Sequence, residues 1–224
     1  MMISQILLRN IDLLSEETSI MKEPKTHFKL GITGGIGSGK TSVGRVFEVL
    51  GIPVFSADKN AQDIMDNNLE IKNSLNSISG KNLYINGNLD RALLASIIFN
   101  DSSILKKVNS LVHPAVFDNF TQWTIVQDSP YVIMEAAILF ESGASEFVDR
   151  VVTIVAPVEQ RVARVILRNK LSAQQVMDRM KNQMADETRI KLSDYVIYNS
   201  ENDMIIPVIL KIHNDILTFI KTQS

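Results

Sequence analysis

The chain has 224 residues, of which 45% are hydrophobic and 21% charged, so it carries enough apolar material for a folded core. Its 23 Lys and Arg residues nearly balance 25 Asp and Glu residues, and the net charge of -2 gives no general electrostatic basis for nucleic-acid binding. The lack of Cys excludes disulfides, thiolate nucleophiles and Cys-based zinc sites, and three His residues without paired spacing argue against a His-built metal site.

Residues 1–24 form an N-terminal extension before the regular pattern begins. Their apolar residues are interrupted by polar ones and followed by Glu16 and Glu17, which suits neither a signal peptide nor a transit peptide. Two alternatives stay open: a loosely packed extension, or translation that starts at Met21. No apolar stretch approaches the roughly 20 residues that span a bilayer, so we expect no membrane contact and a cytoplasmic location.

From Phe28 onward, short apolar runs alternate with longer amphipathic segments, a pattern typical of βαβ units that feed a parallel sheet. The apolar runs are continuous rather than alternating, as expected for strands covered by helices on both faces. The sequence therefore predicts a three-layer α/β fold with a five-stranded parallel sheet, whose strands are residues 28–33, 53–55, 131–134, 150–155 and 194–197.

A glycine-rich segment follows the first predicted strand. Residues 34–41 match the pattern G-x-x-x-x-G-K-[ST] and precede an amphipathic segment at 42–50, the context that a phosphate-binding loop requires. Its glycines let successive amides surround an anion at a helix N-terminus, while the Lys side chain reaches the β and γ phosphates and the Thr hydroxyl ligates Mg²⁺. The predicted nucleotide ligands are Gly35, Gly37, Ser38, Gly39, Lys40, Thr41 and Ser42.

Asp58 follows the second predicted strand and is our candidate for the group that orients or deprotonates the phosphoryl acceptor. Such a group is expected at the end of a strand beside the phosphate loop. The alternative is that Asp58 only caps the helix that starts near Lys59. The residues themselves favour neither interpretation.

Residues 59–127 are mostly helical in pattern, are punctuated by Gly80, Gly87 and Pro114, and are interpreted as a lobe inserted between two strands. His113 stands at the end of an apolar segment of this lobe, where a capping or packing role is the more common one, and a hydrogen bond to an acceptor phosphate is the alternative.

The strand after the lobe ends in Glu135, which would place an acid near Mg²⁺. A second acid, Glu141, follows six residues later and either faces solvent or belongs to the site.

The region 158–190 is strongly charged and helical, and we expect it to form a mobile lid. Arg179 and Gln183 make an i, i+4 pair on its second helix. A stripe of arginines that closes over a triphosphate would neutralise charge on the transferring group, whereas the alternative is a solvated, ion-paired face. On the first helix this stripe consists of Arg161, Arg164 and Arg168.

Two classes of phosphate-loop protein do not fit the chain. A regulatory GTPase needs a guanine-reading Asn-Lys-x-Asp segment, but the Asn169-Lys170 pair is followed by Leu171 and Ser172. A motor or transporter ATPase needs a longer chain. A small phosphotransferase with an acceptor lobe and a closing lid remains.

The combined motifs resemble the dephospho-coenzyme A kinase family, over residues 28–199. The resemblance rests on the phosphate loop, the Ala57-Asp58 pair, the His113-Pro114 step and residues 138–141, 159–161 and 194–199. It implies transfer of a phosphoryl group from ATP, with Mg²⁺, to the ribose 3'-hydroxyl of dephospho-coenzyme A, the last step of coenzyme A synthesis. The chain departs from the family pattern at Ser56, Gln62 and residues 135–137.

The resemblance also implies roles for individual residues. Asp58 would activate the hydroxyl, the lid would hold Arg161 and Arg168, and Asn199 would lie near adenine. His113 and Glu141 would lie on the acceptor side, and the metal would lie near Thr41, Asp58 and Glu135.

Residues 25–224 would then form one kinase domain, with an acceptor lobe at about 59–127 and a lid at about 158–190. The partner is a small molecule, with no nucleic acid or membrane, and the expected assembly is a monomer or weak oligomer. Two alternatives stay open: another small-acceptor kinase of the nucleoside monophosphate, shikimate or gluconate type, or a nucleotide-binding module without catalysis.

Overall fold

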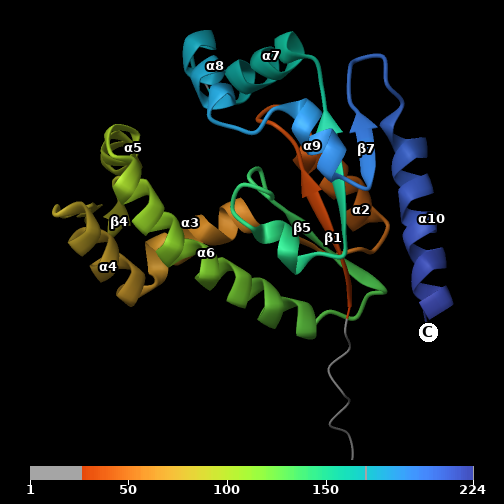
Figure 1. The fold of residues 1–224 in the computed structure, drawn as a ribbon, viewed down its shortest axis with the longest axis horizontal. Helices are drawn as coiled ribbons and strands as arrows, with labels where there is room; N and C mark the ends of the chain where they lie inside the picture. Colours follow the sequence, from red (N-terminus) through yellow and green to blue (C-terminus); the bar gives the residue numbers. More distant parts are fainter. Residues whose placement is uncertain (1–26, 170, 224) are drawn as a thin grey trace, which may run out of the picture.

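The centre of the molecule is a five-stranded parallel sheet with the strand order β2-β5-β1-β6-β7 (Figure 1). The computed structural model describes residues 27–169 and 171–223, so the predicted N-terminal extension lies outside the described residues. All five predicted strands are confirmed within two residues of their expected ends. They are β1 (Phe28–Thr33), β2 (Val54–Ser56), β5 (Tyr131–Glu135), β6 (Arg150–Val155) and β7 (Tyr195–Tyr198).

Helices cover both faces of the sheet. Alternate residues of β5 show this directly, because Tyr131 and Ile133 pack in the core that includes α2 (Lys40–Val49) and α10 (Ile205–Gln223). Val132 and Met134 point the other way, into the core that includes α6 (Ser102–Ile125). All four side chains are inaccessible to solvent. The three-layer fold and the reason for the continuous apolar runs are thus confirmed.

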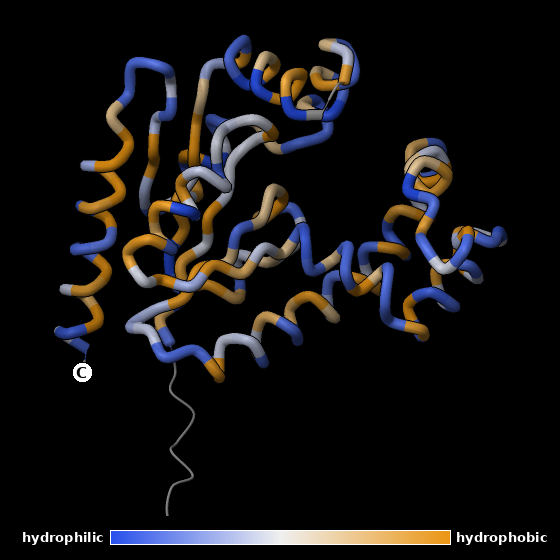
Figure 2. The backbone as a smooth tube through the Cα atoms, turned by 180° about the vertical axis from the view of Figure 1, so that it is seen from behind, coloured by the Kyte–Doolittle hydropathy of each residue, from blue (hydrophilic) through white to orange (hydrophobic). Residues whose placement is uncertain are grey.

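Apolar and polar segments alternate along α10, as expected for a helix with one buried face (Figure 2). Its buried residues are Ile209, Ile212 and Ile216, at i, i+3 and i+7. This helix therefore covers the same face of the sheet as α2 and packs against β7.

The helical lobe extends from the opposite, β2 edge of the sheet (Figure 1). It consists of α3 (Ala57–Asn67), α4 (Leu69–Ser79), α5 (Arg91–Asn100) and α6. A hairpin of β3 (Tyr84–Ile85) and β4 (Asn88–Leu89) was not expected from the sequence. Its two-residue turn is Asn86-Gly87, with φ of 51° and 81°, and Asn-Gly is a strong hairpin signal that the sequence did contain.

Helix α6 continues through Pro114, so Pro114 does not interrupt the lobe as expected. A proline inside a helix costs about 3 kcal/mol, because it removes one backbone hydrogen bond and crowds the preceding turn. Residues on one face of the helix are nevertheless buried every fourth position, at Val108, Val112, Val116 and Phe120. Burial of several such side chains, at about 1.5–3 kcal/mol each, outweighs the cost of the proline.

The predicted lid contains α7 (Val158–Asn169), α8 (Ala173–Lys181) and α9 (Asp186–Leu192). Helices α7 and α8 stand above the sheet, whereas α9 lies against β6 (Figure 1). A short 3-10 helix, η1 (Ala144–Phe147), precedes β6. The end of the region that sequence placed outside the sheet is therefore packed on the sheet.

Candidate functional site

The carboxyl ends of the parallel strands bring the predicted site residues to one edge of the sheet. The phosphate loop follows β1, Asp58 follows β2, Glu135 ends β5 and Asn199 follows β7. At this edge lies an open cavity of about 550 Å³. Its lining includes phosphate-loop, α3 and lid residues, among them Gly37, Gly39, Lys40, Thr41, Ser42, Asp58, Gln62, Glu135, Arg164, Arg168, Arg179 and Gln183.

The phosphate loop has the conformation that anion binding requires. Gly37 and Gly39 have φ of 79° and 101°, a region that side chains disfavour. In the described part of the chain, no backbone acceptor pairs with the amides of Gly39, Lys40 and Thr41. These unpaired amides stand at the N-terminus of α2, so the loop presents donors and the positive helix end together.

Lys40 lies inside the loop that it is predicted to serve. Its Nζ donates to the carbonyl oxygen of Gly34 at 2.9 Å and lies 3.4 Å from that of Gly35. Burial lowers the pKa of Lys40, while the carboxylates of Asp58 and Glu135 oppose this shift. The ammonium therefore lies close enough to both acids to interact with them electrostatically.

Thr41 and Glu135 form a hydrogen bond at the wall of the cavity. The Thr41 hydroxyl donates to Oε1 of Glu135 at 3.0 Å. Burial raises the pKa of Glu135, and the bond from Thr41 and the charge of Lys40 oppose this rise. The two groups expected at the metal are thus in contact, as a hydroxyl and a carboxylate that ligate the same ion would be.

Asp58 lies in the first turn of α3, with its side chain on the cavity. The alternative role as the N-cap is wrong, because the helix starts at Ala57 and its cap is Ser56, whose hydroxyl accepts from the amide of Lys59. The cap leaves the Asp58 carboxylate available for the cavity.

Partial removal from water raises the pKa of Asp58, although its side chain keeps solvent contact on the cavity side. Lys40 and a hydrogen bond from the backbone of Ala137 oppose the rise. Asp58 is thus held beside Lys40 as a carboxylate whose proton affinity exceeds that of an ordinary Asp.

The predicted lid region supplies several cations to the same cavity. Arg164, Arg168 and Arg179 line it. The Nη2 of Arg164 donates to the backbone oxygen of Asn199 at 3.0 Å, and its buried Nη1 has no hydrogen-bond partner within the described residues.

Arg161 lies behind the phosphate loop rather than in the cavity. Its Nε donates to the Ile36 oxygen at 2.9 Å, its Nη1 donates to Asp186 at 2.8 Å, and the residue is 4% exposed. The sequence placed Arg161 and Arg168 in one catalytic stripe, but α7 directs Arg161 into the core and Arg168 to the cavity.

Asn199 connects the loop to the end of β7. Its Nδ2 donates to the Ser38 oxygen at 2.7 Å, and its amide donates to the Val155 oxygen at 2.8 Å. A Cβ atom at Gly39 would overlap the Asn199 amide group, so only glycine fits there. Beside Asn199 is a second cavity of about 340 Å³, lined mainly by apolar atoms of residues that include Val155, Pro157 and Tyr198.

Two predicted acceptor residues lie elsewhere. His113 is half-buried in α6, with its ring 6.1 Å from that of Phe117, and does not line the described cavity. Glu141 does not line it either, because the turn after β5 directs its carboxylate to the amide of Met184 at 2.9 Å. For Glu141 the structure thus gives a contact with the lid in place of the expected contact with the acceptor.

Sequence reasoning missed Asp186 and Arg189, which the structure places behind the phosphate loop together with Arg161. Arg189 is 1% exposed and pairs with Asp186 at 2.6 Å. Their i, i+3 spacing was the available signal, but such pairs are common on exposed helix surfaces. Only the packing of α9 against β6 distinguishes this pair from the exposed ones.

Comparison with known proteins identifies the family. A family model described as dephospho-CoA kinase matches residues 28–204. The chain belongs to the dephospho-CoA kinase family. Its activity is therefore the ATP-dependent phosphorylation of dephospho-CoA, a step of coenzyme A biosynthesis.

Individual relatives agree with this family. A dephospho-CoA kinase of Bacteroides fragilis is 38% identical over 185 residues, which cover 82% of this chain and 90% of that protein. One from Porphyromonas gingivalis is 35% identical, over 84% and 94% of the two chains.

Solved structures share the fold. A Thermus thermophilus crystal structure superposes with a TM-score of 0.77 at 31% identity, and covers 85% of this chain and 98% of that one. The dephospho-CoA kinase of Campylobacter jejuni gives a TM-score of 0.62 at 29% identity, over 85% and 97%. In the described residues, no helix is both long and apolar enough to span a membrane.

Proposed function

We propose that the cavity between the phosphate loop, α3 and the lid is where the γ-phosphoryl group of ATP passes to the ribose 3'-hydroxyl of dephospho-CoA. One observation carries the proposal: Lys40, in the phosphate loop, and Asp58, in the first turn after β2, line the same cavity and interact electrostatically. A cation for the phosphates and a base for the hydroxyl are the two groups that this transfer needs.

The loop binds the phosphates of ATP. The unpaired amides at the start of α2 donate to phosphate oxygens, and Lys40 exchanges its bonds to Gly34 and Gly35 for bonds to the more strongly accepting phosphate. Adenine enters the smaller apolar cavity beside Asn199. The residues that contact the nucleotide are then Gly35, Gly37, Ser38, Gly39, Lys40, Thr41, Ser42 and Asn199.

Asp58 acts as the base. The acceptor hydroxyl gives its proton to the Asp58 carboxylate, its oxygen bonds to the γ-phosphorus, and the bond from that phosphorus to the β–γ bridging oxygen breaks to leave ADP. The raised pKa strengthens Asp58 as a base, and the bond from Ala137 orients the carboxylate.

The residues present fit Mg²⁺. Thr41, Glu135 and Asp58 offer the oxygen ligands that this ion prefers, and no cluster of three or more His, Cys, Asp or Glu residues suited to a metal occurs in the part of the chain that the structure describes. A site with few protein ligands is usual for Mg²⁺, which keeps its waters and binds phosphate oxygens. When bound, the ion neutralises negative charge on the β and γ phosphates.

The lid completes the site. Arg164, Arg168 and Arg179 neutralise the charge of the transferring group, which is worth most when the closed lid excludes water. The lobe contributes the rest of the acceptor site, and His113 stays a predicted acceptor contact.

An acceptor panel tests the proposal. Transfer to dephospho-CoA should greatly exceed transfer to AMP, CMP, shikimate or gluconate, with phosphate found on the ribose 3'-oxygen of the product by NMR. Equal turnover of an unrelated acceptor would overturn the assignment.

Asp58→Asn tests the base. It should lower kcat by on the order of 10²-fold or more, with little change in ATP affinity, because general-base catalysis has about this size. Asp63→Asn, an exposed position on the same helix, is the matched control. Equal loss in both variants would remove Asp58 from the mechanism.

A further inference from the structure

A network of four charged side chains, two of them buried arginines, lies behind the phosphate loop. The Asp186 carboxylate accepts from Arg161 Nη1 at 2.8 Å with one oxygen and from Arg189 Nη1 at 2.6 Å with the other. Arg161 is 4% exposed and Arg189 is 1% exposed. Glu141 balances the second arginine, with Oε1 3.7 Å from Arg189 Nη2. Two buried cations are thus paired with two partly exposed carboxylates, and burial tolerates such cations only when they are paired.

At its inner end this network of charged side chains reaches the backbone of Ile36. Arg161 Nε donates to the Ile36 oxygen at 2.9 Å, and the Ile36 amide donates to Gln183 Oε1 at 2.8 Å. The Arg161 guanidinium lies so close to Gly35 that a Cβ there would overlap it. Both backbone groups of one loop residue are therefore held by side chains from the lid region.

These bonds have a consequence for the neighbouring peptide groups. A trans peptide is planar, so its C=O and N–H point in opposite directions. Fixing the Ile36 carbonyl therefore fixes the direction of the Gly37 N–H, and Gly37 lines the cavity. In the same way, fixing the Ile36 amide fixes the Gly35 carbonyl, which accepts from the amide of Ser38 at 3.1 Å.

Stability alone does not account for Arg189. Its Nε and Nη2 are buried without a hydrogen-bond partner in the described part of the chain. Buried donors left unpaired are costly, and buried ion pairs can often be replaced by apolar side chains without loss of stability. The benefit of this arginine therefore lies in what it holds, which is Asp186.

We propose that Arg189 is a positioning residue for the kinase reaction. It holds Asp186, Asp186 holds Arg161 against Ile36, and the loop amides are thereby aimed at the phosphates. The inference rests on the proposed function in one respect, which is that ATP phosphates bind this loop.

The test is nucleotide affinity without the acceptor. Arg189→Met keeps an unbranched apolar side chain but removes the guanidinium and its charge, and we expect the dissociation constant for ATP, measured by calorimetry, to rise about tenfold, or about 1.4 kcal/mol. KM for dephospho-CoA should change less than about twofold. Arg189→Lys retains one charged bond to Asp186 and should restore the affinity to within about threefold of the unmodified protein.

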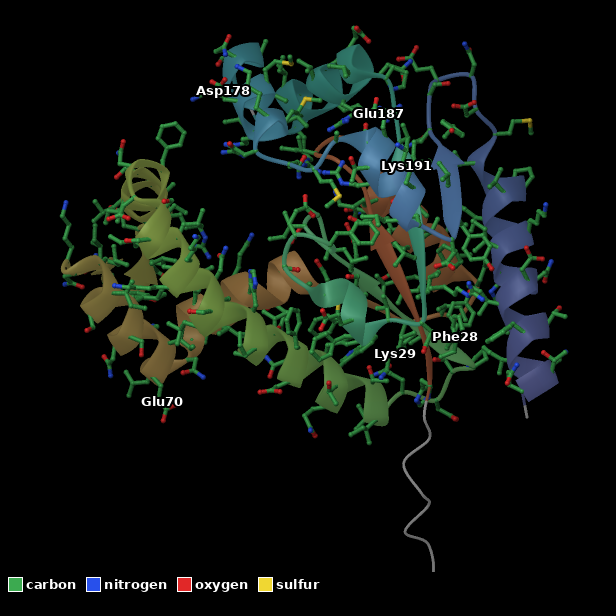
Figure 3. All side chains as sticks on the ribbon, viewed as in Figure 1. Phe28, Lys29, Glu70, Asp178, Glu187 and Lys191 are labelled. Carbon is green, nitrogen blue, oxygen red and sulfur yellow. The ribbon has the colours of Figure 1, made fainter. Side chains whose placement is uncertain are left out.

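Matched controls lie on the same helix. Glu187 and Lys191 of α9 are exposed and are labelled in Figure 3. Glu187→Gln and Lys191→Met should leave ATP affinity and turnover unchanged. Thermal unfolding of every variant identifies a temperature at which all are folded, so that loss of structure is not mistaken for loss of affinity.

A double variant tests whether Arg189 acts on the loop through Asp186. If Arg189 acts through Asp186, Asp186→Asn should weaken ATP binding at least as much, and adding Arg189→Met should weaken it no further. Additive losses would contradict the order. Asp186→Asn, which is isosteric, also carries the test if Arg189→Met does not fold.

The outcomes separate the two proposals. If the unmodified protein neither binds ATP nor phosphorylates dephospho-CoA, the proposed function fails. If it does both and folded Arg189→Met binds ATP with unchanged affinity, only the positioning role is overturned.

Discussion

At the scale of single residues, Asp58 combines a proposed catalytic role with an environment that disfavours its charge. Its raised pKa means that protonation reaches the base at a higher pH than for an ordinary Asp. We expect kcat to fall on the acid side with an apparent pKa above 3.8, and Asp58→Asn to remove this limb from the residual activity. A limb that persists unchanged in Asp58→Asn would assign it to another group.

The raised pKa of Asp58 also predicts that the Asp58→Asn variant is at least as stable as the unmodified protein. A carboxyl whose folded pKa lies above its unfolded value stabilises the fold at low pH, and that contribution is lost as pH rises through the folded pKa. At neutral pH, ionised Asp58 therefore opposes folding, and Asp58→Asn should unfold at an equal or higher temperature while turnover collapses. A clear fall in the midpoint, measured by calorimetry at pH 7, would contradict the proposed cost.

Thr41 allows a second test at the residue scale. Thr41→Val keeps the shape of the side chain and removes the hydroxyl that donates to Glu135. We expect the Mg²⁺ concentration for half-maximal activity to rise severalfold, because one oxygen ligand is lost. Thr121→Val, on an exposed face of α6, is the control. The same Mg²⁺ dependence in both variants would exclude Thr41 as a ligand.

At the scale of elements, the strands and the phosphate loop were predictable because local rules decide them. The continuous apolar runs and the residue 34–41 motif are properties of neighbours in sequence. The path of α6 through Pro114 could not be predicted in this way. The cost of the proline is local, whereas the burial of Val112, Val116 and Phe120 depends on the sheet. The interpretation of Asp58 as the N-cap was wrong because Ser56, two residues earlier, caps α3.

Helix α8 yields the prediction for the lid. Arg179 lines the cavity, whereas Lys181, two residues later, is exposed and pairs with Asp178. Arg179→Met should lower kcat by about tenfold or more with a smaller change in KM for ATP, because a closed lid neutralises charge that develops during transfer. Lys181→Met removes a cation from the same helix and should leave both constants unchanged. Equal effects would show that only the net charge of the lid matters.

At the scale of the whole molecule, the sequence could not predict which charged side chains become buried. Arg161, Arg164 and Arg168 share one predicted stripe, yet the structure sends one to the core and two to the cavity. Periodicity gives the direction of a side chain relative to its own helix but not what the helix packs on. The Asp186–Arg189 pair was missed for the same reason, since its partners Arg161 and Glu141 come from segments far apart in the sequence.

Burial of histidine links the stability of the whole fold to pH. Burial lowers the pKa of both His113 and His213, and Nδ1 of His213 lies 2.8 Å from the Tyr131 hydroxyl, which joins α10 to β5. A lowered folded pKa gives stability that is complete above the unfolded value of about 6.5 and is lost as pH falls through the folded value. Each site contributes up to about 1.4 kcal/mol per pH unit in that window.

His213→Asn and His113→Phe should each make the free energy of unfolding fall less steeply between pH 6.5 and 5. Asn214→Ala, an exposed neutral change on α10, should leave the slope unaltered. The raised pKa values of Asp58 and Glu135 act with the opposite sign at lower pH, so the difference between each variant and the unmodified protein isolates the histidines. Parallel denaturant-derived stability curves for all the proteins would show that neither histidine is coupled to folding.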